Sequence, residues 1–329
     1  MKKLVSLYGA HSPLYDQMNE RAKTYAAGRG LDYVWVPQTP FSPDSAVEAL
    51  RGADAGIIDV DRYDGAIFSQ IKDSVKILVR YGVGFEAVNL PDASANGIAI
   101  ARTTGANAEA VAEMAMAMIL GAKRQLMRNR YVANSGVWGA KDVGGEMKGK
   151  KLGLLGFGMI SRLLAGLFSG FQVEVLAYDP FLSKESMAAA GARKVDLDEL
   201  FRESDAISIH IPYTEESYHL VNAERLAMMK ETAVLVCAAR GNIVDEDALY
   251  EALKARRILG AGLDVFAREP LPADSPLTRL DNVILTPHVA AQTEEALWAM
   301  YQKAVDIAAD FLDGRDIGRD LLNPEYKNA

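Results

Sequence analysis

Three polar side chains follow apolar runs in the last third of the chain, and their types suit chemistry on a carbonyl beside a carboxylate. Arg240 lies in CAARGNIVDEDAL, Glu269 in GLDVFAREP and His288 in ILTPHVAAQT. Arginine offers a fixed cation and a planar fork of donors that can hold a carboxylate and a neighbouring carbonyl oxygen. Histidine exchanges protons near neutrality, and an adjacent carboxylate favours its protonated form. The trio predicts hydride and proton transfer to a 2-keto acid.

The segments that precede these residues predict the sheet that positions them. From Lys151 onwards, apolar runs alternate with helical or loop segments; the runs are LGLLGF, EVLAYD, AISIHIP, AVLVCAA, GAGLDV and NVILTP. Such alternation predicts parallel strands with crossover helices, as in a dinucleotide-binding domain. Each residue of the trio comes just after a predicted strand or in the loop beyond it. All three are therefore expected at the carboxyl edge of the sheet, where ligands bind in such folds.

The first hundred residues predict a second, smaller parallel sheet. Its strands are LVSLYG, DYVWV, AGIIDV and KILVRYG, with helical patterns between them. A long helix predicted over residues 107–123 is apolar around most of its circumference, so we expect it to be buried between domains or at a subunit contact. Thr293 is predicted to cap a final helix that packs back onto the first domain, with an apolar face of Leu297, Met300, Tyr301, Ala304 and Phe311.

These patterns together predict an α/β protein with two doubly wound lobes. The chain has 329 residues, which exceeds the size at which one hydrophobic core usually stops growing. The expected substrate domain is flavodoxin-like and discontinuous, formed by residues 1–102 and 293–329. A Rossmann-type dinucleotide-binding domain of residues 103–292 is inserted in it, and the active cleft is expected between the lobes.

Composition narrows the classes of partner. The net charge of −8 disfavours non-specific nucleic-acid binding, and no run approaches the roughly 20 apolar residues of a membrane span. The single cysteine, Cys237, lies in an apolar run and is expected to be a buried thiol, so no disulfide forms within the chain. HExxH and CxxC patterns are absent, so no metal site is expected. We expect a cytoplasmic protein that binds neither nucleic acid nor membrane.

A glycine-rich turn between a strand and a helix predicts the cofactor site. Gly156 and Gly158 allow a tight turn and close approach of the backbone to a pyrophosphate, which the N–H groups of the following helix then face. Ser161 stands where a third glycine usually supports close packing, and its effect on cofactor affinity is left open. Asp179 ends the next strand, where a carboxylate accepts the ribose hydroxyls and repels a 2′-phosphate. This combination favours NAD over NADP.

The remaining histidines are expected to have structural roles. His210 ends a predicted strand before Pro212 and is expected to pack near the cofactor. His219 lies in a polar turn and His11 follows the first strand, so both are expected to be structural or to face solvent.

Ordered motifs from about Val75 to Ala291 resemble the D-isomer-specific 2-hydroxyacid dehydrogenase family, which includes phosphoglycerate, glycerate/hydroxypyruvate and D-lactate dehydrogenases. The matching stretches are RYGVGFEAVNL, TTGANAEAVAE, LLGFGMIS, YDP and the three segments that hold the trio. The resemblance implies that Arg240 binds substrate, His288 is the acid/base and Glu269 is its partner. It also implies that the N–H groups of Val83 and Gly84 receive the substrate carboxylate. The implied cofactor-binding residues are Gly156, Gly158, Met159, Ile160, Asp179, Ile211, Ala238, Arg240, Asp264 and His288, with Asp264 at the nicotinamide end.

Several questions stay open after this comparison. The tripeptide Phe85-Glu86-Ala87 departs from the family's commoner Tyr/Val-Asp-Asn, so the substrate loop is expected to differ in shape. Arg80 is either a phosphate contact or, as we favour, a salt-bridge residue. The segment NSGVWG around Trp138 resembles the family's dimer arm and implies a homodimer.

Two other functions share this architecture. Formate dehydrogenases place glutamine where Glu269 stands, so Glu269 counts against that activity. NAD(H)-sensing corepressors can keep all three residues and remain an alternative. The identity of the 2-keto or 2-hydroxy acid does not follow from the sequence, and the favoured candidates are hydroxypyruvate, a 3-phosphoglycerate-type acid or a similar small acid.

Overall fold

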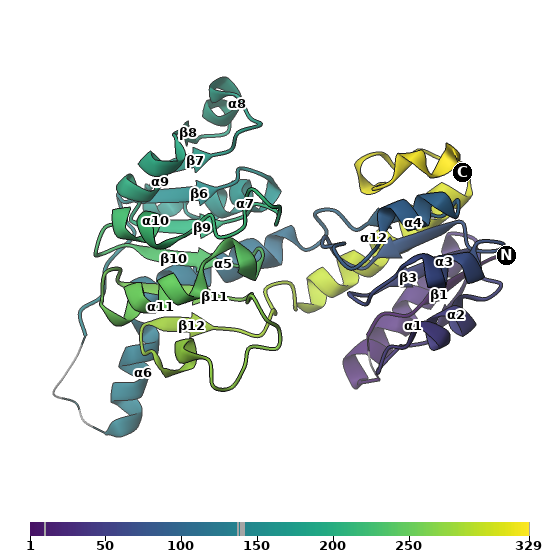
Figure 1. The fold of residues 1–329 in the computed structure, drawn as a ribbon, viewed down its shortest axis with the longest axis horizontal. Coiled ribbons are helices and arrows are strands. Elements are labelled where there is room, and N and C mark those ends of the chain that lie inside the picture. The colour runs from purple at the N-terminus through teal and green to yellow at the C-terminus, as the bar shows by residue number, and fades with distance from the viewer. Residues whose placement is uncertain (10, 137, 139–141, 329) are drawn as a thin grey trace. The chain divides into compact units, whose positions relative to one another are not determined.

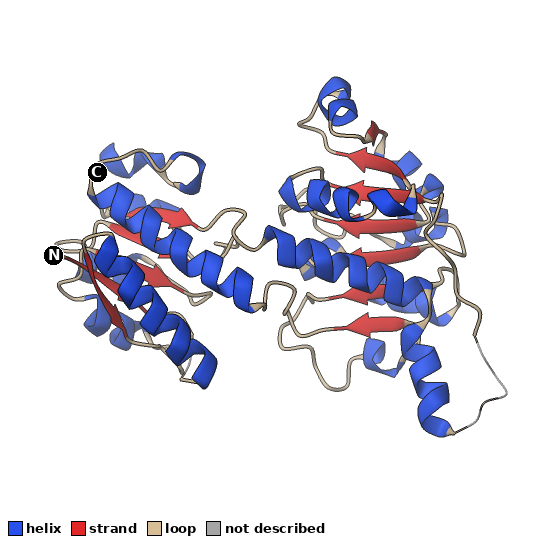
Figure 2. Ribbon diagram, turned by 180° about the vertical axis from the view of Figure 1, so that it is seen from behind, coloured by secondary structure: helices blue, strands red, loops and turns tan. Residues whose placement is uncertain are grey.

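The computed structural model of the chain describes residues 1–9, 11–136, 138 and 142–328 (Figure 1). The chain divides into two compact units, each with its own sheet. Unit 1 consists of Met1–Asn107 and Thr293–Ala329, and unit 2 of Ala108–Gln292. Both sheets are parallel, with helices on their faces, which confirms the predicted α/β class (Figure 2).

Unit 1 has a five-stranded parallel sheet in the order β2-β1-β3-β4-β5. This is the flavodoxin-like order expected for the smaller lobe. Four of the strands coincide with predicted runs, whereas β5 is a short additional strand at the edge beside β4. The strands are β1 (Lys2–Ser6), β2 (Leu31–Trp35), β3 (Ala55–Ile58), β4 (Ile77–Arg80) and β5 (Ala99–Arg102).

Helices from both ends of the chain cover the sheet of unit 1. α1 (Pro13–Gly28) and α12 (Glu294–Leu312) share a core with one face of the sheet. The other face is covered by α2 (Pro43–Leu50), α3 (Gly65–Ile71) and α4 (Leu90–Ala95). The Thr293 hydroxyl accepts a hydrogen bond from the Ala296 N–H and caps α12, as predicted. The C-terminal helix therefore belongs to the N-terminal unit.

Unit 2 has a seven-stranded parallel sheet in the order β12-β11-β10-β9-β6-β7-β8. Counted from its own first strand, this is the Rossmann order 3-2-1-4-5-6 with one strand added beyond the sixth. The prediction missed β8, because two polar residues carry no apolar pattern. The strands are β6 (Lys151–Leu155), β7 (Glu174–Tyr178), β8 (Arg193–Lys194), β9 (Ala206–Ile209), β10 (Val234–Cys237), β11 (Gly260–Leu263) and β12 (Val283–Leu285).

The helices of unit 2 lie on both faces of its sheet. α5 (Ala108–Lys123) and α7 (Met159–Leu167) share a core with one face. α9 (Leu197–Glu203), α10 (Ala223–Met228) and α11 (Glu246–Lys254) share a core with the other. The other helices of unit 2 are α6 (Leu126–Ser135) and α8 (Lys184–Ala189), and its short 3₁₀ turns span Ser169–Phe171, Gly241–Ile243 and Pro276–Arg279. Two further 3₁₀ turns, Gly318–Asp320 and Pro324–Asn328, belong to unit 1.

The apolar circumference of α5 has an explanation other than the predicted domain or subunit contact. α5 packs against β10, β11, β12 and α7, so the sheet of its own unit buries it.

α6 contributes no buried residue, and Trp138 beyond it is exposed. Val137 and Gly139 of the suggested dimer arm lie outside the described residues. None of the described helices is long and apolar enough to cross a membrane.

Candidate active site

Three neighbouring strands of unit 2 bring the predicted trio to one edge of the sheet. β10, β11 and β12 are adjacent and parallel, so their carboxyl ends meet at the same edge. Arg240 follows β10, Glu269 lies in the loop after β11, and His288 follows β12. Arg240, Glu269 and His288 therefore lie at the carboxyl edge of the sheet, where the apolar runs predicted them.

His288 and Glu269 form a hydrogen-bonded pair. The distance between Nδ1 of His288 and Oε2 of Glu269 is 2.8 Å. The other carboxylate oxygen, Oε1, accepts a hydrogen bond of 3.0 Å from the Phe266 N–H, which anchors Glu269. Both side chains are partly exposed, at 52% for His288 and 37% for Glu269. Among the described residues nothing is hydrogen-bonded to Nε2 of His288, so this nitrogen can exchange a proton with a ligand.

Asp264 holds the loop that carries His288. His288 has a φ of 55°, an uncommon conformation for a residue other than glycine. Oδ1 of Asp264 accepts hydrogen bonds from the Thr286 hydroxyl at 2.5 Å and the Val289 N–H at 2.9 Å, and Oδ2 accepts one from the Ala290 N–H at 2.8 Å. Asp264 is fully buried. The carboxylate thus stabilises the His288 loop, and the contact with the nicotinamide end stays a prediction.

Gly241 brings the Arg240 loop against the Glu269 loop. A Cβ at Gly241 would lie 1.9 Å from the Phe266 carbonyl carbon, so no larger residue fits. Arg240 is partly buried, and its Nη1 donates a hydrogen bond of 2.6 Å to the Ala239 carbonyl. The backbone contact at Gly241 therefore keeps the guanidinium-bearing loop next to the peptide that anchors Glu269.

The glycine-rich turn has the geometry of a phosphate-binding loop. Gly156 has a φ of 88°, and a Cβ there would meet Ile211 at 2.9 Å and the His210 carbonyl oxygen at 3.0 Å. Gly158 precedes α7, faces open space, and leaves the first turn of this helix without a side-chain cap. The uncapped N–H groups and the helix dipole favour an anion at this position. The loop therefore fits the pyrophosphate of a dinucleotide.

Asp179 is bound to the same loop. Its Oδ2 accepts a hydrogen bond of 3.0 Å from the Phe157 N–H, and its Oδ1 accepts one of 3.0 Å from the Phe181 N–H. These bonds fix the carboxylate at the end of β7, where the sequence predicted a ribose contact. The side chain of Met159 is 41% exposed beside the turn, while Ile160, Ile211 and Ala238 are partly buried.

The other predicted histidines and Cys237 have structural surroundings. Nε2 of His210 lies 2.8 Å from the Ser208 hydroxyl, and burial lowers the pKa of His210 to about 4. His219 stacks on Tyr218 at 3.9 Å between ring centroids, and His11 is largely exposed beside Asp16. Cys237 is a buried free thiol whose pKa burial raises to about 11. The sequence-based prediction of structural roles for these histidines agrees with their contacts.

Ser161, in place of the third glycine, strengthens the loop. Its buried hydroxyl donates a hydrogen bond of 2.6 Å to the Gly156 carbonyl. Ser161→Ala leaves that carbonyl without its donor, so we expect the free energy of unfolding to fall by about 1 to 3 kcal/mol and the Kd for NADH to rise by about 3- to 10-fold. Urea unfolding and fluorescence titration with NADH measure the two effects. Ser186→Ala is the control, since Ser186 is an exposed serine within α8. Unchanged values for both quantities in Ser161→Ala would contradict this role.

The predicted substrate loop belongs to unit 1. Val83 and Gly84 follow β4 at the carboxyl edge of that sheet, and both are partly exposed. Arg80, at the end of β4, is buried near Asp59; burial raises the pKa of the Asp59 carboxyl, although the Arg80 charge opposes this. Arg80 thus has an acidic neighbour, as the favoured salt-bridge interpretation requires.

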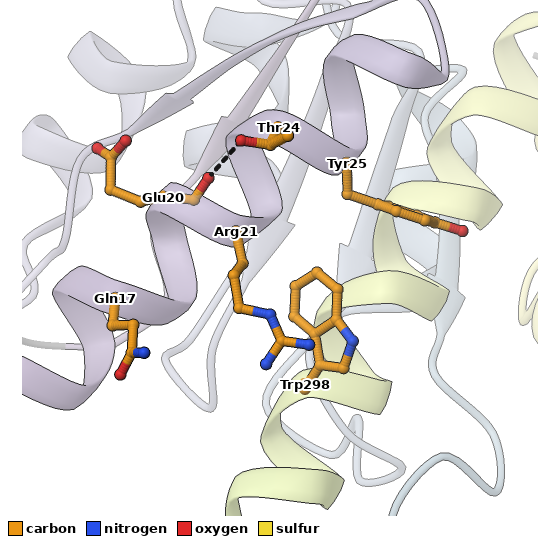
Figure 3. A pocket seen from close by; sticks show the side chains of 6 residues that line it. All are labelled: Gln17, Glu20, Arg21, Thr24, Tyr25 and Trp298. Atoms are coloured by element: carbon orange, nitrogen blue, oxygen red, sulfur yellow. Dashed lines mark hydrogen bonds between the residues drawn. The ribbon is translucent and has the colours of Figure 1, made fainter.

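A separate groove of about 510 Å³ lies beside α1 and α12 of unit 1 (Figure 3). It is lined by residues of α1 and by Trp298 of α12, and the Arg21 guanidinium lies 3.9 Å from the Trp298 ring centroid. The groove contains none of the residues predicted to bind substrate or cofactor. It is therefore a surface feature outside the candidate active site.

Comparisons with known proteins agree with this geometry. Residues 116–290 match the family described as D-isomer specific 2-hydroxyacid dehydrogenase, NAD binding domain. A glyoxylate reductase of Korarchaeum cryptofilum is 35% identical over 299 residues, covering 89% of each chain. A hydroxypyruvate reductase of Thermotoga maritima is 41% identical over 227 residues, covering 68% of this chain and 73% of that protein. The structure of a D-lactate dehydrogenase from Aquifex aeolicus with NAD and lactic acid has a TM-score of 0.79 and 27% identity, covering 98% of this chain and 99% of that one.

The sheet order and the glycine-rich turn define an NAD-binding α/β protein. The match and the relatives go further: the chain belongs to the D-isomer specific 2-hydroxyacid dehydrogenase family. The resemblance inferred from the ordered motifs is thereby confirmed, as is NAD as the cofactor.

Proposed function

We propose that this protein is an NAD-dependent D-2-hydroxyacid dehydrogenase that interconverts a small 2-keto acid and the D-2-hydroxy acid. The observation that carries the proposal is the 2.8 Å hydrogen bond between His288 and Glu269 at the carboxyl edge of the unit 2 sheet. Reduction of a carbonyl requires a proton donor at this position, whereas transfer of a hydride alone does not.

The roles of the residues follow from their chemistry. When NADH is bound, it supplies the hydride to C2 of the keto acid. Nε2 of His288 donates the proton to the carbonyl oxygen, and in the reverse direction it removes the hydroxyl proton. Glu269, held by the Phe266 N–H, fixes the imidazole orientation and stabilises its cationic form. Arg240 binds the carboxylate and polarises the carbonyl through its planar fork.

The names of the relatives support small substrates. Two of them are a glyoxylate reductase and a hydroxypyruvate reductase. We propose hydroxypyruvate, glyoxylate or a similarly small acid as the substrate of this chain. The same proposal assigns the ribose of the cofactor to Asp179, whose charge repels a 2′-phosphate.

Steady-state oxidation of NADH with a panel of keto acids tests this function. The panel contains pyruvate, hydroxypyruvate, glyoxylate and 3-phosphohydroxypyruvate, each assayed with NADH and NADPH. We expect turnover with at least one acid and a kcat/KM at least about tenfold higher with NADH, because Asp179 disfavours the phosphate. Tight NADH binding without turnover of any acid would instead indicate a cofactor-sensing protein.

A further inference from the structure

Two backbone N–H groups in the loop after β4 are open to a ligand. These are the N–H groups of Val83 and Gly84, which the family resemblance implies as the groups that receive the substrate carboxylate. Among the described residues neither group donates a hydrogen bond. An open pair of N–H groups at the carboxyl edge of a parallel sheet is suited to an anion. The affinity of this pair for an anion depends on how firmly the two N–H groups are held in their orientation.

The carbonyl groups of the same peptide units determine the orientation of these N–H groups. The peptide bonds of the loop are trans. The carbonyl of one residue and the N–H of the next therefore lie in the same peptide plane and point in opposite directions. The Gly82 carbonyl therefore sets the direction of the Val83 N–H. The Val83 carbonyl likewise sets the direction of the Gly84 N–H. A group that holds either carbonyl thus orients the N–H across from it.

The end of β5 holds both carbonyls. The Thr103 N–H donates a hydrogen bond of 3.1 Å to the Gly82 carbonyl, and the Thr103 hydroxyl accepts one of 2.8 Å from the Gly82 N–H. Nη1 of Arg102 donates a hydrogen bond of 3.3 Å to the Val83 carbonyl. β4 and β5 pair in parallel with Arg80 opposite Arg102, which places both donors beside the loop.

The Arg102 side chain spans the loop around Gly84. Its guanidinium carbon lies 5.3 Å from the centroid of the Phe85 ring, within the range of a cation–π contact. The buried Nε has no hydrogen-bond partner among the described residues, so Nη1 and the ring contact define the position of the guanidinium. Phe85 is part of the tripeptide that departs from the commoner family sequence, and its ring contacts the Arg102 guanidinium.

We propose that Arg102 is a positioning residue for the substrate carboxylate, an inference that rests on the proposed function. By holding the Val83 carbonyl, Arg102 directs the Gly84 N–H outward, toward the carboxylate. Its charge polarises this peptide unit and adds positive potential at the place where the anion binds. Thr103 does the same for the Val83 N–H without a charge.

Arg102→Met tests this role because methionine keeps an apolar stem beside Phe85 but removes the charge and the donor. We expect the KM for the best keto acid to rise about tenfold, with kcat within about threefold and the Kd for NADH unchanged. The Kd for oxamate, an unreactive pyruvate analogue, should rise by the same factor in the complex with NADH. Arg102→Gln should behave like Arg102→Met, whereas Arg102→Lys should recover part of the affinity.

Arg51→Met is the matched control, since Arg51 is an exposed arginine at the end of α2 in the same unit. It should leave KM and the oxamate Kd unchanged. Wild-type protein without keto-acid turnover would refute the proposed function itself. Turnover by the wild type, together with unchanged KM and oxamate Kd in Arg102→Met and Arg102→Gln, would overturn only the role of Arg102. So would failure of both variants to fold, which would make Arg102 a stability residue.

Discussion

His288→Gln is expected to lower kcat for the best keto acid by about 10²- to 10⁴-fold, the usual contribution of a positioned proton donor. Glutamine has a similar reach and can still hydrogen-bond to Glu269, but it cannot transfer a proton. Because the loop is held by Asp264 rather than by the imidazole, its backbone should be preserved. The Kd for NADH should therefore change by less than about threefold. Steady-state kinetics and NADH titration measure the two quantities separately.

His11→Gln is the matched control for this experiment. His11 has a 74% exposed side chain in unit 1, and it pairs only with Asp16 and the Trp35 ring among the described residues. Its replacement should leave kcat unchanged. Near-native turnover by His288→Gln would refute the acid/base assignment, whereas a loss of NADH binding equal to the loss of turnover would point to a disturbed loop.

The candidate trio could be predicted from the sequence because strand patterns and ligand edges are linked by simple geometry. An apolar run followed by one polar residue places that residue at the carboxyl end of a parallel strand, and neighbouring strands then bring such residues together. The distance between His288 and Glu269 was not predictable in this way. It depends on the Phe266 N–H that anchors Glu269 and on the buried Asp264 that holds the next loop.

The missed features have equally physical reasons. β8 consists of Arg193 and Lys194, which carry no apolar alternation, so only pairing with β7 reveals the strand. Arg102 lies one residue past an apolar run and has the sequence appearance of a surface residue. The positioning role proposed for Arg102 depends on the Val83 carbonyl, which lies in a loop about 20 residues away in the sequence. No local sequence pattern indicates such a contact. The burial of α5 was predicted, but which surface covers it depends on tertiary packing.

The parallel character of both sheets could be predicted from alternating strand and helix patterns. The complete strand orders could not, because the patterns did not show β5 and β8. α12 follows unit 2 in the sequence and belongs to unit 1, as the sequence predicted. Its capping by Thr293 was visible in the sequence, and its apolar face indicated a partner surface. The sequence predicted that this surface belongs to the first domain, whereas the individual contacts with α1 and β4 could be identified only in the structure.

Arg240→Lys should lower kcat/KM for the best keto acid by about 10²- to 10³-fold although the charge is kept. A lysine is a point charge without the planar fork, so it cannot present two parallel, coplanar hydrogen bonds to a carboxylate and a neighbouring carbonyl oxygen. Loss of the carboxylate contact should raise KM, because that contact is present before and during the reaction. Loss of the carbonyl contact should lower kcat, because the oxygen becomes more negative in the transition state.

Arg279→Lys in the same unit supplies the control, since Arg279 is exposed and should tolerate the change. Measuring kcat, KM and the Kd for oxamate in both variants separates the two contributions of Arg240. A higher oxamate Kd with unchanged kcat would assign Arg240 to carboxylate binding alone. Values within about threefold of the wild type for all three quantities would remove Arg240 from the site, because a lysine cannot reproduce the bidentate geometry of the guanidinium without a larger loss.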